Sequence, residues 1–357
     1  MRNLLFGATL ALSMATSALA DFQVVVPQKP SGGTGVWANL VATEINKYLP
    51  ADDQLVLEFI PGEKDRKALK DYARYNKAAE GIIQITHGGN AESFLQLDLK
   101  GFDYRDLEPV LIQNLDIIIS KLSNFKPENG DRPILSSCSG CASEAMAIAL
   151  LTCGPGKSVD GYLACFKEEV SWIPGMSGGD RRIAFKNGEL NASRDNPIKT
   201  RQKYGKMFES GTADIWFSHG VLNASTGQHE DDPNFPNSLM EDKFMSKWGE
   251  APSGEFYDAY KLLKSWRDGL QKTFFIPADH PRKDVLHKAV ADMLANADSV
   301  ALLEKEIGVY PTLIGAEAQA HLDMLFTLIT KESLQNLLHV SKETIGAEGI
   351  FKPELLQ

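Results

Sequence analysis

The chain is poor in cysteine and has no long hydrophobic run, and each shortage excludes a class of protein. Only four of its 357 residues are cysteine. No stretch beyond the N-terminal segment reaches the roughly 18 apolar residues that a membrane-spanning helix needs. A nucleotide-binding fingerprint, a nucleophile elbow, a metal motif and paired catalytic carboxylates at a recognisable spacing are also missing. The sequence therefore predicts neither an integral membrane protein nor an enzyme of a class that such motifs reveal, and we expect no metal and no cofactor.

Positive charge is scarce as well. Lysine and arginine number 37 against 47 aspartates and glutamates, which gives a formal net charge of −10. A protein of this charge is not expected to bind nucleic acid or an anionic membrane surface, and an anionic ligand would have to be held by local donors. The composition is otherwise that of a globular protein, with 43% hydrophobic residues. About 340 residues after a leader are more than one core usually supports, so two domains are expected.

The first twenty residues have the layout of a secretion signal. Arg2 precedes an apolar stretch from Leu4 to Met14, and Ala18-Leu19-Ala20 forms a cleavage site of small residues. We expect cleavage after Ala20 and a soluble, exported protein. A lipid anchor is not expected, because the first cysteine is Cys138.

The four cysteines, Cys138, Cys141, Cys153 and Cys165, lie close together in the sequence. In an oxidising compartment, an even and clustered set favours disulfides, although three connectivities are open. The C-x-x-C spacing of the first two also occurs in thiol oxidoreductases and zinc sites, but the usual redox neighbours and a second ligand pair are missing. We predict structural bridges, with Cys138–Cys141 and Cys153–Cys165 as the favoured pairing.

Strands and helices alternate along the chain, which is typical of α/β proteins with parallel sheets. Strands are predicted at 22–26, 54–60 and 82–86, with helices after the first two, and His87 to Asn90 form a loop. Pro109–Ser120 reads as a strand pair with a turn, where the chain would cross into a second unit. That unit has predicted strands at 134–135, 170–173, 190–193 and 213–218, and helices at 143–151, from 180, and at 200–209.

The C-terminal third is predicted to be mainly helical. Gln228–Gly254 is polar and reads as an extended surface loop, helices follow at 284–295, 299–307 and 316–325, and a tail starts at Lys331. We expect lobe 1 to comprise residues 21–115 and about 219–357, and lobe 2 about 116–218. Two α/β lobes that present glycine- and serine-rich loops predict a clamshell with a ligand cleft between the lobes.

The clearest sign of a binding site follows the first predicted strand. Phe22–Val26 leads through Pro27 and Pro30 into Ser31–Gly35, where an amphipathic helix begins. Glycines permit tight turns and leave backbone N–H groups accessible, and a helix N-terminus adds about half a positive charge. This loop is suited to an anion, and a small carboxylate is the expected one.

Several short motifs, in this order along the chain, resemble one family. They are V-P-x-x-P-x-G-G-T at 26–34, Pro61-Gly62, Thr86-His87-Gly88-Gly89, Phe102–Val110, Ser136–Glu144, Gly178-Gly179, 188–196 and Phe274–Pro281. Together they resemble the periplasmic solute receptors of tripartite tricarboxylate transporters, the Bug-type or TctC-like proteins. The resemblance implies two α/β lobes that close on a small organic acid. It also implies a monomer, a periplasmic location, integral-membrane permease subunits as partners, and no enzymatic activity.

The resemblance also implies which residues bind. Two loops of the family grip one carboxylate, and they correspond here to Ser31–Gly35 and Ser137–Ser143. Hydroxyl and backbone N–H donors in these loops suit that role. The expected ligand-binding residues are Ser31, Gly32, Gly33, Thr34, Gly35, His87, Gly88, Asn90, Ser137, Ser139, Gly140, Ala142, Ser143, Gly178, Gly179, Arg194 and Asp195.

Arg194 is the most informative of these residues. It follows the predicted strand at 190–193, where the family has a cleft residue. Its guanidinium could clamp the distal carboxylate of a di- or tricarboxylate through two parallel hydrogen bonds. The alternative is a structural ion pair with Asp195, and the sequence leaves both open.

The chain departs from the family pattern at four places, one of which is the pair of cysteines in the loop at 136–142. Gly35 replaces a common aspartate, charged residues at 63–67 replace a glycine-rich loop, and the polar segment 228–254 is an insertion. These differences bear on which acid is bound rather than on the fold. Two other functions remain open from the residues alone, namely an exported enzyme that acts on a small carboxylate and a periplasmic sensory receptor.

Overall fold

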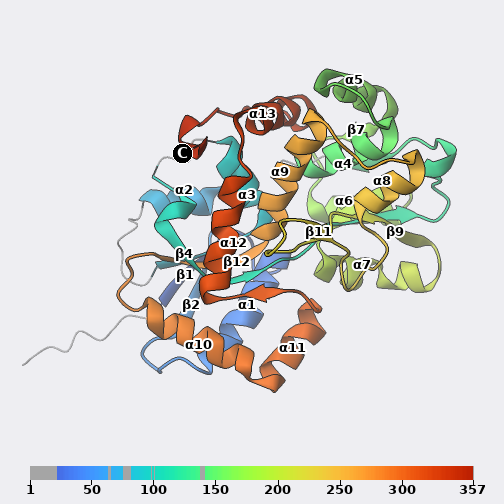
Figure 1. The fold of residues 1–357 in the computed structure, drawn as a ribbon. Coiled ribbons are helices and arrows are strands. Elements are labelled where there is room, and N and C mark those ends of the chain that lie inside the picture. Colours follow the sequence, from blue (N-terminus) through green and yellow to red (C-terminus); the bar gives the residue numbers. More distant parts are fainter. Residues whose placement is uncertain are drawn as a thin grey trace, which may run out of the picture.

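The computed structural model describes residues 22–62, 66–74, 82–97, 99, 101–136 and 141–356, which form two α/β lobes (Figure 1). The predicted secretion signal and residues 137–140 lie outside the described residues. None of the helices in the described ranges has the length and apolar character needed to cross a membrane.

Lobe 1 is built on a six-stranded sheet in the order β13-β4-β12-β3-β1-β2. Strands β1, β2 and β3 are parallel, and β12 and β13 run antiparallel to their neighbours. The three N-terminal strands lie where the sequence predicts them. The strands are β1 (Phe22–Val26), β2 (Leu55–Phe59), β3 (Ile82–Thr86), β4 (Leu107–Gln113), β12 (Lys272–Pro277) and β13 (Thr312–Leu313).

Helices pack against this sheet because its strands are apolar on both faces. Val24, Ile83 and Phe274 are fully or almost fully buried, and Trp37 packs on Phe274 with ring centroids 5.3 Å apart. The helices of lobe 1 are α1 (Gly33–Asn46), α2 (Lys67–Arg74), α3 (Gly88–Gln96), α10 (Lys283–Ala295), α11 (Ala297–Ile307) and α12 (Gly315–Thr327).

Lobe 2 has a three-stranded antiparallel sheet in the order β8-β5-β9 and a parallel pair, β6-β7. The two strands expected within Pro109–Ser120 exist, but they do not pair with each other. Strand β4 belongs to lobe 1 and β5 to lobe 2, so the chain crosses between the lobes at 114–117. The elements are β5 (Ile118–Leu122), β6 (Ile134–Ser136), α4 (Ala142–Cys153), α5 (Val159–Glu169), β7 (Ser171–Ile173), α6 (Gly178–Lys186), β8 (Ala192–Asp195), α7 (Pro197–Glu209) and β9 (Ala213–Ser218).

The C-terminal half differs from the sequence prediction at several places. The segment 228–254 is not one extended loop, because it contains β11 (His229–Glu230), which pairs with β10 (Val221–Leu222), and α8 (Met240–Trp248). Helix α8 forms because Met240 and Phe244, four residues apart, are both fully buried. The tail from Lys331 begins with a further helix, α13 (Lys331–Ile345).

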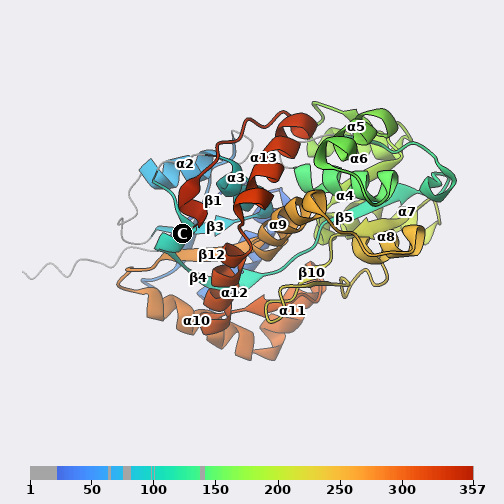
Figure 2. The same cartoon turned by 45° about the horizontal axis from the view of Figure 1, so that its top comes forward.

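Helix α9 (Glu255–Gly269), which the sequence did not predict, connects the lobes. It packs against α3 of lobe 1 and α4 of lobe 2, and α13 lies across α9, α4 and α5 (Figures 1 and 2). One apolar cluster accordingly includes Phe94 of α3, Met146 of α4 and Trp266 of α9. The two lobes therefore share part of their core.

The disulfide prediction is confirmed for one bridge. Cys153, the last residue of α4, is bonded to Cys165 of α5, with Cα atoms 6.1 Å apart. Cys141 is also disulfide-bonded, and its predicted partner, Cys138, lies outside the described residues. No free cysteine occurs in the part of the chain that the structure describes.

Candidate ligand-binding cleft

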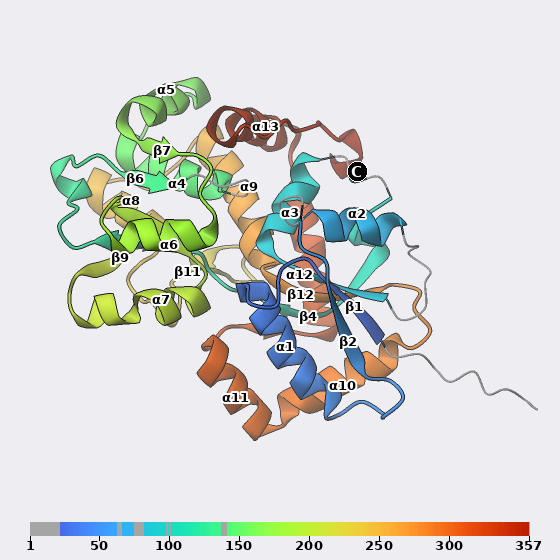
Figure 3. The same cartoon turned by 180° about the vertical axis from the view of Figure 1, so that it is seen from behind.

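A cavity of about 680 Å³ lies between residues of the two lobes. Lobe 1 contributes the β1–α1 loop, the start of α3 and the segment after α9. Lobe 2 contributes the start of α6 and the end of β8. Figure 3 shows this side of the molecule, with α1 and β1 in one lobe and α6 and α7 in the other. Elements far apart in the sequence thus form the two walls.

The β1–α1 loop forms the lobe 1 wall. Gly32 caps α1 in an extended conformation and has no side chain to accept a hydrogen bond from the first helical turn. Gln28 supplies part of that cap, because its Oε1 accepts a hydrogen bond of 3.2 Å from the Thr34 amide. Ser31, Gly32, Gly33 and Thr34 line the cavity, whereas Gly35 does not. A Cβ atom at Gly35 would clash with the carbonyl oxygen of Lys29, so this glycine is needed for the turn itself.

Gly33 lies where the two lobes meet. A Cβ atom at this position would clash with Nδ2 of Asn196. Asn196 belongs to lobe 2, where its Oδ1 caps α7 by accepting a hydrogen bond of 2.9 Å from the Lys199 amide. A side chain at Gly33 would therefore meet the opposite lobe as well as any bound anion.

The predicted loop at 87–90 is the start of α3. His87 caps the helix, its Nδ1 accepts a hydrogen bond of 3.0 Å from the Gly89 amide, and its own amide donates to Oδ1 of Asn90 at 3.3 Å. His87 lines the cavity. Gly88 and Asn90 do not, because Gly88 packs against Arg267 and Asn90 is fully buried in the cap.

The start of α6 forms the opposite wall. Ser177 and Asp180 make a capping box, in which the Asp180 amide donates to Oγ of Ser177 at 3.2 Å and the Asp180 carboxylate accepts from Ser177. This box fixes the helix start, so that Gly178 and Gly179 line the cavity. The next residues, Arg181 and Arg182, follow within the first turn.

Both arginines lie near the end of β8. Arg182 binds Asp195 in bidentate fashion, with Nε and Nη2 at 2.7 and 2.5 Å from the two carboxylate oxygens. Nη2 of Arg181 is 3.8 Å from the same carboxylate. Asp195 is 4% exposed, so this group of charges is largely removed from water.

A buried charge network forms the floor of the cleft. Glu144 of α4 is 1% exposed, and its Oε1 lies 3.2 Å from Nη1 of Arg194 and 3.4 Å from Nη2 of Arg267. Oε2 of Glu144 accepts a hydrogen bond from the Ser143 hydroxyl at 3.0 Å. Arg267 also binds Glu92 of α3 at 2.7 Å. Four elements of both lobes thus meet in one ionic cluster.

The two carboxyl groups of this network titrate in opposite directions. Burial opposes the ionisation of Glu144, but Arg194 and Arg267 outweigh it and lower the pKa to about 2. For Glu92, burial dominates over the attraction of Arg267, and the nearby Glu144 charge adds to it, so that the pKa rises to about 7. Burial also lowers the pKa of Arg194 to about 10, against the pull of Glu144. At neutral pH, Glu144 is ionised and Glu92 is partly protonated.

The predicted site residues fall into three groups by position. Residues that line the cavity are Ser31, Gly32, Gly33, Thr34, His87, Gly178, Gly179, Arg194 and Asp195. Gly35, Gly88, Asn90, Ala142 and Ser143 lie behind the cavity wall, and Ser137, Ser139 and Gly140 lie outside the described residues. The expected alternative for Arg194, a pair with Asp195, is not formed, because Arg194 binds Glu144 while Arg182 holds Asp195.

Sequence reasoning missed five of the six lysines and arginines that line the cavity, including Lys29 of the β1–α1 loop. Arg181 and Arg182 directly follow the predicted loop at 178–180, so their position in the first turn of a helix was a usable signal. Arg267 and Lys272 adjoin α9, which was not predicted.

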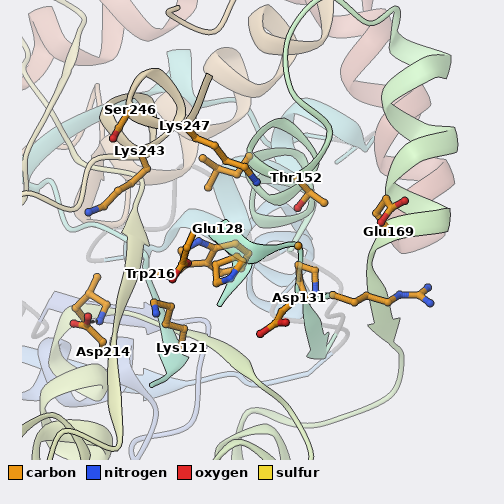
Figure 4. A pocket seen from close by; sticks show the side chains of 16 residues that line it. Lys121, Glu128, Asp131, Thr152, Glu169, Asp214, Trp216, Lys243, Ser246 and Lys247 are labelled. Carbon is orange, nitrogen blue, oxygen red and sulfur yellow. Dashed lines mark hydrogen bonds between the residues drawn. The ribbon is translucent and has the colours of Figure 1, made fainter. Parts of the chain in front are cut away.

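Charge distinguishes this cavity from a second one. The described lining of the cleft includes six lysines and arginines and a single carboxylate, that of Asp195. The other cavity, of about 620 Å³ in lobe 2, surrounds Trp216 and has four lysines or arginines and four carboxylates (Figure 4). None of the predicted site residues lines it. Of these two cavities, only the cleft has an excess of positive charge. No group of three metal-binding side chains occurs among the described residues.

No family model matches the chain, and no curated protein matches it in sequence. Solved structures do match. MatC from Rhodopseudomonas palustris, with bound malate, has a TM-score of 0.55 at 16% identity, over 90% of this chain and 99% of that one. An R. palustris protein with adipate gives 0.55 at 15% identity, over 91% and 97%. The periplasmic binding protein BugD gives 0.54 at 14% identity, over 92% and 98%.

These matches cover nearly the whole of each chain, and they include proteins of the kind that the sequence motifs resemble. The expectation of a two-lobed α/β fold is thereby confirmed. The chain has the fold of the periplasmic binding proteins, with its positively charged cavity between the lobes.

Proposed function

We propose that the protein captures a small organic acid in the cleft between its lobes. The observation that carries this proposal is the excess of lysine and arginine around the cavity, in a protein whose net charge is −10. The net negative charge of the protein repels an anion, so an anion can be held only where positive charge is concentrated locally. A volume of about 680 Å³ is within the range of small-molecule sites.

The arrangement of the walls favours reversible binding. Each wall belongs to a different lobe, so a ligand that contacts both would stabilise the closed arrangement of the lobes. The start of α1 offers backbone donors, and the arginines of lobe 2 offer guanidinium groups, both of which suit carboxylates. The similar structures of MatC with malate and of the R. palustris protein with adipate support a carboxylate as the ligand.

The proposal extends to the protein's place in the cell. A periplasmic, monomeric receptor would deliver the acid to integral-membrane permease subunits of a tripartite tricarboxylate transporter. The similarity to BugD and to MatC supports this assignment over that of an enzyme.

A ligand screen tests the proposal. The protein from residue 21 onward is heated with mono-, di- and tricarboxylates, and hits are measured by calorimetry. A ligand at 100 times its dissociation constant adds about 2.7 kcal/mol of stability, which is a clear rise in Tm. Neutral diamides serve as the chemical control, and Lys243→Gln in the second cavity serves as the protein control, with unchanged affinity expected.

Two results would contradict the proposal. One is the absence of any stabilising acid in the screen. The other is conversion of a bound acid to a product, detected by NMR. This result would favour an enzyme.

A further inference from the structure

The lobe 2 wall contains one arginine that the protein itself leaves poorly compensated. Arg181 is 5% exposed and lines the cleft. Its nearest carboxylate oxygen, on Asp195, is 3.8 Å away, which is beyond hydrogen-bond distance. Among the residues that the structure describes, none accepts a hydrogen bond from its Nε. A buried guanidinium in this state has lost water without gaining a full counter-ion.

Its two arginine neighbours each lie closer to a carboxylate than Arg181 does. Asp195 is engaged by Arg182 through two short hydrogen bonds. Arg194 lies beside Glu144 at 3.2 Å, although the sequence suggested Arg194 as the clamp for a distal carboxylate. Three guanidinium groups therefore share two carboxylates on this wall, and Arg181 is the group left without a close partner.

The position of Arg181 also suits an anion. Its Nη2 lies 3.8 Å from the point where a Cβ atom of Gly178 would be, so the guanidinium folds back beside the start of α6. The capping box uses the amide of Asp180, and the amides of Gly178 and Gly179 precede it in the same turn. A guanidinium next to a helix N-terminus favours an anion that accepts two parallel hydrogen bonds, such as a carboxylate.

Resting on the proposed function, we propose that Arg181 binds the second acidic group of the ligand. The first acidic group lies at the start of α1 in lobe 1, and the second lies at Arg181 in lobe 2. The ligand is therefore a dicarboxylate or a larger acid that spans the cleft, and Arg181 is the residue that selects it over a monocarboxylate.

The energetic reason for selection is the state of Arg181 in the closed cleft. A monocarboxylate held at the start of α1 leaves the guanidinium buried and still uncompensated. A second carboxylate provides two charge-assisted hydrogen bonds, and the loss of such a contact costs roughly ten- to a hundredfold in affinity.

The test compares Arg181→Gln, Arg181→Lys and Lys186→Gln. Lys186 lies exposed in the last turn of the same helix, so its variant removes the same charge away from the cleft. Succinate, malate, glutarate, adipate and citrate are titrated calorimetrically, with butyrate and hexanoate as monocarboxylates, and Tm reports folding.

The expected result is a selective loss. Arg181→Gln weakens the polycarboxylates that the wild-type protein binds by about ten- to a hundredfold and leaves the monocarboxylates within a factor of about two. Arg181→Lys falls between, because it keeps the charge and loses the planar fork. Lys186→Gln matches the wild-type protein.

Other outcomes overturn the inference. Equal losses for mono- and polycarboxylates would make Arg181 a structural residue, and no loss would make it irrelevant to binding. If Arg181→Gln lowers Tm so far that it cannot be titrated, Arg181→Lys decides, and unchanged selectivity in that variant refutes the proposal. A wild-type protein that binds no acid at all refutes the proposed function itself, and this result is distinct from the others.

Discussion

Replacing Glu92 by glutamine should stabilise the ligand-free protein at pH 8 but hardly at pH 5. Glu92 is 1% exposed, and its one ionic partner within hydrogen-bond distance among the described residues is Arg267, which also lies beside Glu144. Burial raises the pKa of Glu92 from 4.5 to about 7. In the unfolded chain, the same group ionises near its ordinary value.

The sign and size of this change in stability follow from the difference between the pKa of Glu92 in the folded and the unfolded chain. A carboxyl group whose pKa is higher in the folded state contributes its stability below the unfolded value, and that stability is lost as the pH rises from about 4.5 towards 7. The full shift corresponds to about 3 kcal/mol, of which roughly 2 to 3 kcal/mol falls between pH 5 and pH 8. Glutamine cannot ionise, so the variant avoids this loss.

Urea unfolding at pH 5, 6, 7 and 8 measures the effect as a difference between variant and wild type. Because other groups titrate alike in both proteins, their contributions cancel in that difference. The free-energy gain of Glu92→Gln should grow with pH by roughly 2 to 3 kcal/mol and level off above pH 7. Fluorescence and circular dichroism must give the same transition, because a two-lobed protein need not unfold in one step.

Glu144→Gln is the matched control, since it removes the other carboxylate of Arg267. The pKa of Glu144 is lowered to about 2, so its stabilising effect is complete above pH 5 and is lost only in strong acid. This variant should be destabilised at both pH 5 and pH 8, and somewhat less at pH 8, because loss of the Glu144 charge also lowers the pKa of Glu92. A constant difference for Glu92→Gln, or a Glu144→Gln variant more stable than the wild type at pH 5, would refute the reasoning about the network.

Three further predictions concern single groups. Arg194→Ala should lower the free energy of unfolding by about 3 kcal/mol in urea, because it leaves a buried carboxylate with one partner fewer; an unchanged midpoint would contradict this. Gly33→Leu should weaken acid binding at least tenfold in calorimetry with little change in Tm, since leucine would displace Asn196 of the other lobe. Replacing Cys153 and Cys165 by serine should cost about 3 kcal/mol, measured by urea unfolding, since the bond closes a loop of 12 residues.

Local signals in the N-terminal half made much of lobe 1 predictable. Phe22–Val26 and Ile82–Thr86 are short apolar runs that end at proline, histidine or glycine, and both are strands of the six-stranded sheet. Ser31–Thr34 and His87 follow these strands and line the cavity. The pattern of a buried strand followed by a glycine-rich helix start lies within one short stretch of sequence. It can therefore be recognised without knowledge of distant contacts.

Helices α8 and α9 were missed because their apolar residues are separated by charged ones. In α9, Phe256, Tyr260, Leu263 and Trp266 are buried at helical spacing, yet Lys264, Arg267 and Asp268 are buried as well. A helix that packs against both lobes has no wholly polar face, and this weakens the amphipathic pattern by which surface helices are recognised.

The partners of the charged residues could not be predicted for a different reason. Arg194 lies at the end of β8, Glu144 at the start of α4 and Arg267 at the end of α9. Their contact depends on how the lobes pack, and residue type alone does not choose between Glu144 and the adjacent Asp195 as the partner of Arg194. Strand geometry gives part of the reason, because neighbouring residues of a strand point to opposite faces and need not share a partner.

The net charge of the chain does not predict the charge of the cleft, because that charge depends on which residues the fold brings together. The chain carries −10 overall, yet six lysines and arginines and a single carboxylate line one cavity. Three carboxylates, from Glu92, Glu144 and Asp195, are placed among those cations and neutralise at most half of them. A ligand in the cleft meets the cations that these carboxylates leave uncompensated. On the lobe 2 wall, the least compensated cation is Arg181. Selectivity for a second acidic group would then depend on which arginines the protein pairs internally, rather than on how many it has.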